Sequence, residues 1–187
     1  MGQVLFAVLL SVWGVMDFYL FFLYRPGEHV VRIERWSKYV LLVCVLFGLL
    51  GGLATVPGAL GAFTNPFSSL RYLAFLFMPL GIILRVVAVR QLGPYFSVDV
   101  GLPREQRLYT GGLYSFIRHP SYLGEIVFSL GVAVALHHPV ASLLAFLLPL
   151  LAFLYRIRLE EGILLKALGE AYLHYRQRTY CLIPYIY

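Results

Sequence analysis

The chain has 187 residues, of which 60% are hydrophobic and 13% are charged, with a formal net charge of +6. The apolar share is far above that of a soluble domain, so the composition predicts one membrane domain. The basic residues lie beside long apolar runs and form no separate basic segment, which argues against nucleic acid and favours anionic membrane lipids as partners.

Five apolar runs are long enough to cross or nearly cross a bilayer, which needs about 20 residues of helix. The first run has no basic n-region and no small-residue cleavage site, so we expect a retained helix and not a signal peptide. The predicted spans are Val4–Tyr24, Tyr39–Val56, Leu70–Val89, Tyr122–Leu136 and Val140–Tyr155.

Two short features could suggest metal or disulfide chemistry. His137 and His138 separate the last two spans, but no carboxylate or cysteine partner lies near them in sequence. Cys44 and Cys181 have no paired metal-ligand spacing and suggest no disulfide framework. We therefore expect no metal.

The loop charges predict an orientation in the membrane. Thirteen of the fifteen lysines and arginines fall on one side of the five predicted spans, whereas the loop 57–69 carries no charge. By the positive-inside rule, the basic side is cytoplasmic. The sequence thus predicts an outside N-terminus and a cytoplasmic C-terminus.

Four charged residues fall inside the predicted spans, and one of them, Arg71, lies near one end of the third span. Asp17 and Arg85 could pair across helices, either structurally or beside a cavity, because unpaired ions are costly in a membrane. Glu125 lies in the first turn of the fourth span, where it is either a functional carboxylate or one at headgroup level.

A polar, aromatic turn precedes the fourth span. Pro120 suits the first turn of a helix and leaves His119 just outside it, beside backbone N–H groups that favour an anion. Gly111 and Gly112 permit close backbone approach to a ligand. Taken alone, Arg118-His119-Pro120 is also compatible with an ordinary loop-to-helix junction with a snorkelling arginine.

The fifth span is followed by a charged tail. Arg156 and Glu160 lie four residues apart and share a helix face, as an intrahelical ion pair or as a site for an anionic ligand. Glu161 is offset by one residue. The apolar spacing of the tail predicts an amphipathic interfacial helix, interrupted at Gly169 and ended by Pro184. The predicted fold is all-α, with about five transmembrane helices and this C-terminal helix.

Two motif blocks resemble the isoprenylcysteine carboxyl methyltransferase family, which is related to the phospholipid N-methyltransferases. The first runs from Gly112-Leu113-Tyr114 through Arg118-His119-Pro120-Ser121-Tyr122 to Gly124. The second comprises Arg156, Glu160-Glu161 and Leu164, followed by Gly169-Glu170, Tyr172, Tyr175 and Leu182-Ile183-Pro184. The resemblance covers roughly residues 84–184.

The resemblance implies S-adenosylmethionine as the methyl donor. It assigns catalysis to Arg156 and Glu160, with Arg156 binding the substrate carboxylate. Asp99 and Gln106 stand where the family often has His or Gln, a departure that affects part of the cofactor mapping. The implied cofactor-binding residues are Gln106, Arg107, Leu108, Tyr109, Tyr114, His119, Pro120, Ser121, Tyr122, Glu160 and Glu161.

We therefore expect a single membrane domain over residues 1–187. Residues 1–83 would be the candidate for substrate selection, and residues 84–187 the methyltransferase core. The predicted function is carboxyl O-methylation of an isoprenylcysteine-like or other lipid carboxylate, which is ionised near neutral pH and needs no general base.

Two alternatives remain open from the sequence. One is N-methylation of a phospholipid or other small lipophilic amine, for which a base such as His119 or Glu125 would be essential. The other is a non-catalytic membrane scaffold. The expected partners are membrane lipids and a lipophilic small-molecule or prenylated substrate.

Overall fold

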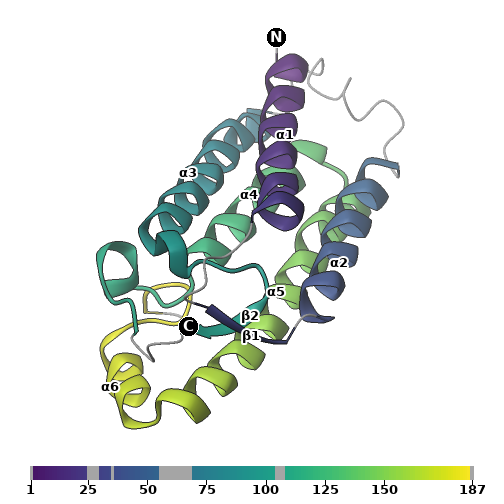
Figure 1. The fold of residues 1–187 in the computed structure, drawn as a ribbon. Coiled ribbons are helices and arrows are strands. Elements are labelled where there is room, and N and C mark those ends of the chain that lie inside the picture. Colours follow the sequence, from purple (N-terminus) through teal and green to yellow (C-terminus); the bar gives the residue numbers. More distant parts are fainter. Residues whose placement is uncertain (1, 25–29, 35, 55–68, 104–107, 186–187) are drawn as a thin grey trace.

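The computed structural model describes residues 2–24, 30–34, 36–54, 69–103 and 108–185. The long helices form a bundle, and a small sheet, the last helix and the C-terminus gather at the end opposite the N-terminus (Figure 1). The helices are α1 (Gly2–Phe18, continued by a π-helical turn at Tyr19–Leu23), α2 (Trp36–Ala54), α3 (Ala74–Leu92), α4 (Pro120–Leu136), α5 (Pro139–Leu168) and α6 (Glu170–Arg178).

Four of these helices (α1, α2, α3 and α5) are long and apolar enough to cross a membrane, and α4 is a shorter apolar helix of 17 residues. The all-α integral membrane fold predicted from the sequence is therefore confirmed. Part of the predicted second span and the uncharged loop after it lie outside the described residues. His137, in the left-handed conformation with φ 47°, makes the tight connection between α4 and α5.

Helix α5 differs from the prediction, because it does not end near Tyr155. It continues unbroken for 30 residues, so Arg156, Glu160 and Glu161 lie on the same helix as the fifth span. Gly162 stays within the helix, and Gly169, whose φ is 53°, ends it and precedes the short α6. The predicted interruption at Gly169 is confirmed, and the charged tail is divided between two helices.

A two-stranded antiparallel sheet was not predicted. Strand β1 (Val30–Glu34) pairs with β2 (Val100–Pro103), with Glu34 opposite Val100. The two strands come from the segments before α2 and after α3, which are far apart in sequence. Their pairing provides backbone hydrogen bonds for both segments at the polar end of the bundle.

Close helix packing depends on glycines where helices cross. A Cβ atom on Gly81 of α3 would lie 2.5 Å from the Gly124 carbonyl oxygen of α4, and one on Gly124 would lie 2.7 Å from the Gly81 carbonyl oxygen. Helices α2 and α5 meet in the same way, since a Cβ on Gly48 would lie 2.7 Å from the Leu144 carbonyl oxygen. Small residues at crossings let membrane helices approach closely.

The predicted ion pair within the membrane is confirmed. Arg85 Nε lies 2.8 Å from Asp17 Oδ1 and 2.6 Å from Glu125 Oε1. Trp13 Nε1 donates to Glu125 Oε2 at 3.0 Å, and the Trp13 ring stacks on Phe128 at 4.8 Å between centroids. Helices α1, α3 and α4 thus share one cluster in which each ion has a partner, as a low-dielectric environment requires.

We predict that Gly81→Ala lowers the thermal midpoint of the detergent-solubilised protein. Overpacking of this kind costs about 1–3 kcal/mol, or roughly 5 °C for a chain of this size. Gly162→Ala in α5 is the matched control, because a Cβ there has nothing within 4 Å. The control should keep or slightly raise the midpoint. Equal midpoints for the two variants would contradict the close α3–α4 contact.

Candidate functional site

The turn before α4 has a conformation that glycine permits. Gly112 has φ 57°, and a Cβ there would lie 2.5 Å from Gln91 Nε2. The Gln91 carboxamide oxygen accepts from the Leu113 N–H at 2.9 Å, which ties the turn to α3. Pro120 then starts α4, as predicted, with His119 at the N-cap. The backbone that presents Tyr114 and His119 is therefore fixed on both sides.

The C-terminal tail pairs with this turn, which was not predicted from the sequence. The N–H groups of Arg118 and His119 donate to the carbonyl oxygens of Tyr180 and Cys181 at 2.9 and 3.2 Å. In return, the Tyr180 N–H donates to the Phe116 carbonyl oxygen at 2.9 Å. The tail thus closes the polar end of the bundle beside α4.

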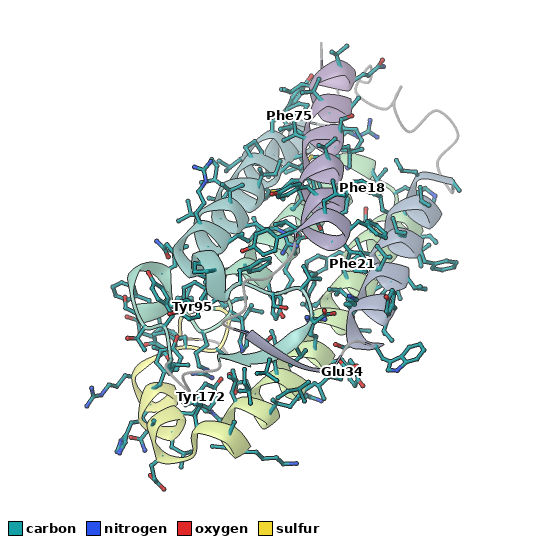
Figure 2. The ribbon with its side chains drawn as sticks, viewed as in Figure 1. Phe18, Phe21, Glu34, Phe75, Tyr95 and Tyr172 are labelled. Carbon is teal, nitrogen blue, oxygen red and sulfur yellow. The ribbon has the colours of Figure 1, made fainter. Side chains whose placement is uncertain are left out.

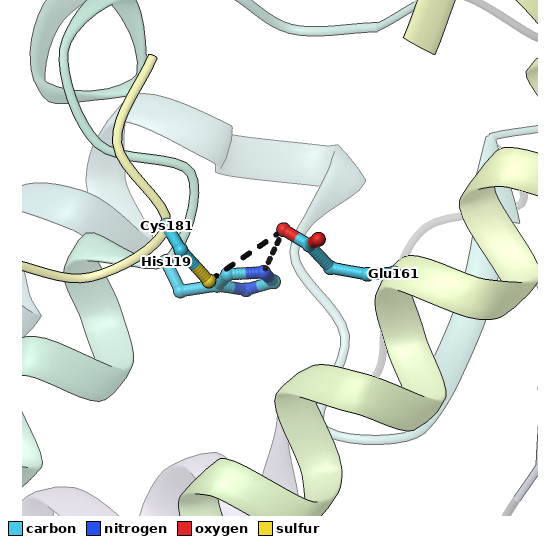
Figure 3. Close-up of side chains that lie close together, drawn as sticks. All are labelled: His119, Glu161 and Cys181. Carbon is cyan, nitrogen blue, oxygen red and sulfur yellow. Dashed lines mark hydrogen bonds and ion pairs between the residues drawn. The ribbon is translucent and has the colours of Figure 1, made fainter. Parts of the chain in front are cut away.

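Glu161 is the centre of a cluster of polar side chains next to this pairing. Its Oε1 lies 2.6 Å from Arg118 Nε, 3.4 Å from His119 Nε2 and 3.6 Å from Cys181 Sγ. Its Oε2 lies 3.4 Å from Arg176 Nε. Figure 3 shows the histidine, carboxylate and thiol meeting at one point.

His119, Glu161 and Cys181 have the residue types of a metal site, with ligand atoms all within 4.8 Å of one another. Two observations favour a hydrogen-bonded ion cluster instead. The Arg118 guanidinium already holds the carboxylate oxygen that a cation would need. Burial raises the pKa of the Cys181 thiol to about 11, so the thiol stays protonated at neutral pH and donates to Glu161.

A cleft opens between the turn, α5 and α6. It consists of two adjoining hollows of about 80 and 270 Å³ that share several lining residues. Of the residues predicted to bind a cofactor, the cleft is lined by Leu108, Tyr109, Tyr114, His119, Ser121, Tyr122 and Glu160. Other lining residues are Leu92, Tyr95, Phe96, Ser97, Asp99, Gly101, Arg118, Leu164, Tyr172 and Tyr175.

Two of the remaining predicted cofactor residues are not among those that line the cleft, and two are not described. Gln106 and Arg107 are outside the described residues. Pro120 is buried at the start of α4, and Glu161 faces the cluster of Arg118, His119 and Cys181. Glu161 and Pro120 therefore lie behind the cleft wall and support the residues that form it.

Tyr172 and Tyr175 were not predicted as site residues, although their spacing of three places them on one helix face. The Tyr175 hydroxyl donates to the Tyr114 carbonyl oxygen at 2.6 Å, and burial raises its pKa to about 12. Burial also raises the pKa of Tyr172, whose hydroxyl is buried without a hydrogen-bond partner among the described residues. Since Tyr172 lines the cleft, this unsatisfied donor is available to a ligand.

Arg156 lies behind the cleft wall and is only 2% exposed. Its Nε donates to the Tyr122 hydroxyl at 2.8 Å, and that hydroxyl donates to Glu160 Oε2 at 2.7 Å. The other two guanidinium nitrogens donate to Ser37 Oγ, at 3.1 Å, and to the Val98 carbonyl oxygen. Arg156 and Glu160 are thus bridged by Tyr122 and do not form a direct ion pair.

A second cavity, of about 270 Å³, lies between the membrane helices, and we call it the membrane cavity. Phe18 and Phe21, which line this cavity, lie right of centre in Figure 2, whereas Tyr95 and Tyr172, which line the cleft, lie at its lower left. Its lining residues are Trp13, Gly14, Asp17, Phe18, Phe21, Phe22, Leu41, Leu42, Val45, Leu46, Arg85, Val98, Glu125 and Phe153.

Comparison with known proteins gives consistent matches. A sequence profile described as the isoprenylcysteine carboxyl methyltransferase (ICMT) family matches residues 73–166. The chain is 30% identical to protein-S-isoprenylcysteine O-methyltransferase of Schizosaccharomyces pombe, over 97% of this chain and 83% of that protein. It is 34% identical to protein-S-isoprenylcysteine O-methyltransferase B of Arabidopsis thaliana, over 57% of this chain and 55% of that protein.

The fold is also similar to a solved structure described as the eukaryotic intramembrane Ras methyltransferase ICMT (isoprenylcysteine carboxyl methyltransferase). The TM-score is 0.59 at 27% identity, with 82% of this chain and 55% of that chain covered. The chain therefore spans most of the Schizosaccharomyces protein and about half of the plant protein and of the solved structure.

We predict that Glu161→Gln destabilises the polar end of the bundle. Leaving Arg118 without its carboxylate costs on the order of 3 kcal/mol, which lowers the thermal midpoint by roughly 6–10 °C. Glu170→Gln is the control, because Glu170 is exposed at the start of α6. A chelator should leave the wild-type midpoint unchanged. A large drop with chelator would instead identify the cluster as a metal site.

Proposed function

The chain belongs to the isoprenylcysteine carboxyl methyltransferase family and is a membrane methyltransferase, and we propose that it methylates the carboxylate of a prenylated cysteine or similar lipid-linked acid, with S-adenosylmethionine as donor. The observation that carries the choice of a carboxylate acceptor is the state of Arg156. It is buried, it donates to three neutral oxygens, and no ion pair joins it to a carboxylate within the described part of the chain. A buried cation that has no carboxylate in direct contact favours an anionic ligand.

The cleft has the residues that the proposed cofactor requires. Aromatic faces of Tyr114 and Tyr122 suit a sulfonium through cation–π contact, worth about 0.5–2 kcal/mol. His119 stacks on Tyr122 at 5.4 Å between centroids, which holds that wall flat. Glu160 provides a negative charge, and the free hydroxyl of Tyr172 provides a donor. S-adenosylmethionine, when bound, supplies an electrophilic methyl group for in-line displacement.

The roles of the side chains follow from this arrangement. Arg156 would hold the acceptor carboxylate by two parallel hydrogen bonds and fix its direction. Tyr122 couples Arg156 to Glu160, so both the anion-binding and the cation-binding sides of the site share one hydroxyl. No proton needs to be removed from an ionised carboxylate. The walls of the cleft therefore act by orientation and exclusion of water.

The membrane cavity suits the lipid part of the acceptor. Its wall is mostly aromatic and aliphatic, and most of it comes from α1 and α2. We propose that residues 1–83 select the acceptor chain, while residues 84–187 hold the cofactor. We also propose that the polar end faces the cytoplasm, where the cofactor is available, because most of the basic residues in the described part of the chain lie at that end.

The geometry gives little support to the amine-methylation alternative. Glu125 is held by Arg85 and Trp13 in the membrane cluster. His119 faces the carboxylate of Glu161. Glu125 is therefore not free to accept a proton from an amine, which leaves His119 as the base that this alternative would need. Membership of a methyltransferase family also argues against the second alternative, a non-catalytic membrane scaffold.

S-adenosylhomocysteine should bind the solubilised protein and raise its thermal midpoint. At a ligand concentration 100 times the dissociation constant, the stabilisation is about 2.7 kcal/mol. Tyr172→Phe should reduce this shift, because it removes the free donor in the cleft, whereas Tyr155→Phe, exposed on α5, should not. No shift at millimolar ligand would exclude the cofactor assignment.

Arg156→Lys should reduce methyl transfer to farnesyl-cysteine about 10- to 100-fold in kcat/KM, because a lysine cannot make the bidentate contact. Cofactor binding, measured by the thermal shift with S-adenosylhomocysteine, should persist. Arg158→Lys is the matched control, since Arg158 is exposed two residues away on the same helix. If Arg156→Lys abolishes the thermal shift and leaves acceptor KM unchanged, the role assigned to Arg156 is wrong.

A further inference from the structure

One short segment separates the cleft from the membrane cavity. Ser97 and Asp99 line the cleft, whereas Val98, between them, lines the membrane cavity. The chain bends at Val98 and Asp99, where the Asp99 N–H donates to Ser97 Oγ at 3.1 Å, and this places Val98 on the opposite side from its two neighbours. The segment is therefore a wall with one polar face and one apolar face.

Two contacts hold this wall in place. Arg156 donates a guanidinium N–H to the Val98 carbonyl oxygen. Lys38 Nζ, from α2, lies 2.6 Å from Asp99 Oδ1. Next to them, Val100 begins β2 opposite Glu34. The wall is thus fastened to α2, to α5 and to the sheet.

The wall lies between the proposed positions of the acceptor and of the methyl donor. The apolar chain of an acceptor in the membrane cavity lies on the Val98 side, and the methyl donor would lie on the other. Of the three groups that accept from Arg156, the Val98 carbonyl belongs to the residue that lines the membrane cavity, so it is the group that an acceptor carboxylate coming from that cavity would replace. The Val98 carbonyl is a single neutral acceptor, whereas a carboxylate carries a full negative charge and can accept two parallel N–H bonds from the guanidinium, so a carboxylate is favoured in this exchange.

Resting on the function proposed above, we propose that Val98 is an anion-selective gate: the acceptor carboxylate displaces the Val98 carbonyl from Arg156 and thereby connects the membrane cavity to the cleft. An apolar molecule without an anion can fill the membrane cavity, but it offers Arg156 nothing better than the carbonyl. The gate then stays closed.

The methylated product, like an apolar molecule without an anion, offers Arg156 no negative charge. Methyl transfer converts the carboxylate into a neutral ester, which binds an arginine no better than a backbone carbonyl does. The Val98 carbonyl can then return to Arg156, and the ester leaves through the membrane cavity. Acceptor selection and product release would thus depend on one hydrogen-bond exchange.

The experiment follows the accessibility of residue 98 from the cleft side. Val98→Cys is treated with a membrane-impermeant charged maleimide, with the wild-type chain correcting for Cys44 and Cys181. N-acetyl-farnesyl-cysteine should raise the labelling rate at least about tenfold. Its carboxamide and its methyl ester should not change the rate. Ser97→Cys, which faces the cleft, is the control and should react with or without acceptor.

Hydrogen exchange of the unmodified chain gives a second measurement that does not depend on the variant folding. The peptide spanning residues 96–101 should exchange faster with the carboxylate acceptor than with the carboxamide. Equal exchange with both compounds, or equal labelling of Val98→Cys, overturns the gate. If farnesyl-cysteine is still methylated in that case, the proposed function stands. Absence of methyl transfer and of any response to S-adenosylhomocysteine overturns the proposed function itself.

Discussion

The ion pair between Arg118 and Glu161 is the constraint on which the polar end of this protein depends. Arg118 lies two residues before α4, and Glu161 lies near the end of α5, so their 2.6 Å contact fixes the distance between the two walls of the cleft. The same guanidinium donates to the carbonyl oxygens of Arg176 and Thr179, which anchors α6 and the tail. Because the pair is largely buried, both charges would be costly without each other.

Much of the fold could be predicted from the sequence, because long apolar runs and helix-starting residues are local signals. The spans and the start of α4 at Pro120 depend on such signals. The two motif blocks could also be assigned to one end of the bundle from the loop charges alone. The length of α5 could not be predicted from hydropathy, because a helix that leaves the membrane changes composition without changing conformation.

Contacts between distant segments account for what could not be predicted. The β1–β2 pairing and the pairing of the tail with the turn join segments that carry no matching local signal. The adjacent residues Glu160 and Glu161 point about 100° apart on a helix, so one lines the cleft and the other meets Arg118. Sequence alone marks both as candidates, and only the position of the neighbouring turn separates their roles.

Arg156 illustrates why a buried arginine is suited to a reaction at a membrane boundary. In contact with Tyr122, Ser37 and Val98, its donors are satisfied but its charge has no counter-ion in direct contact. The Arg118–Glu161 pair and the helix packing stabilise the site and offset the free-energy cost of burying the Arg156 charge. An acceptor carboxylate would give this guanidinium a counter-ion in direct contact, so part of the binding energy would come from lowering the cost of that buried charge. A neutral ester has no charge to pair with Arg156. Substrate and product therefore differ in binding free energy at the group to which the methyl is added.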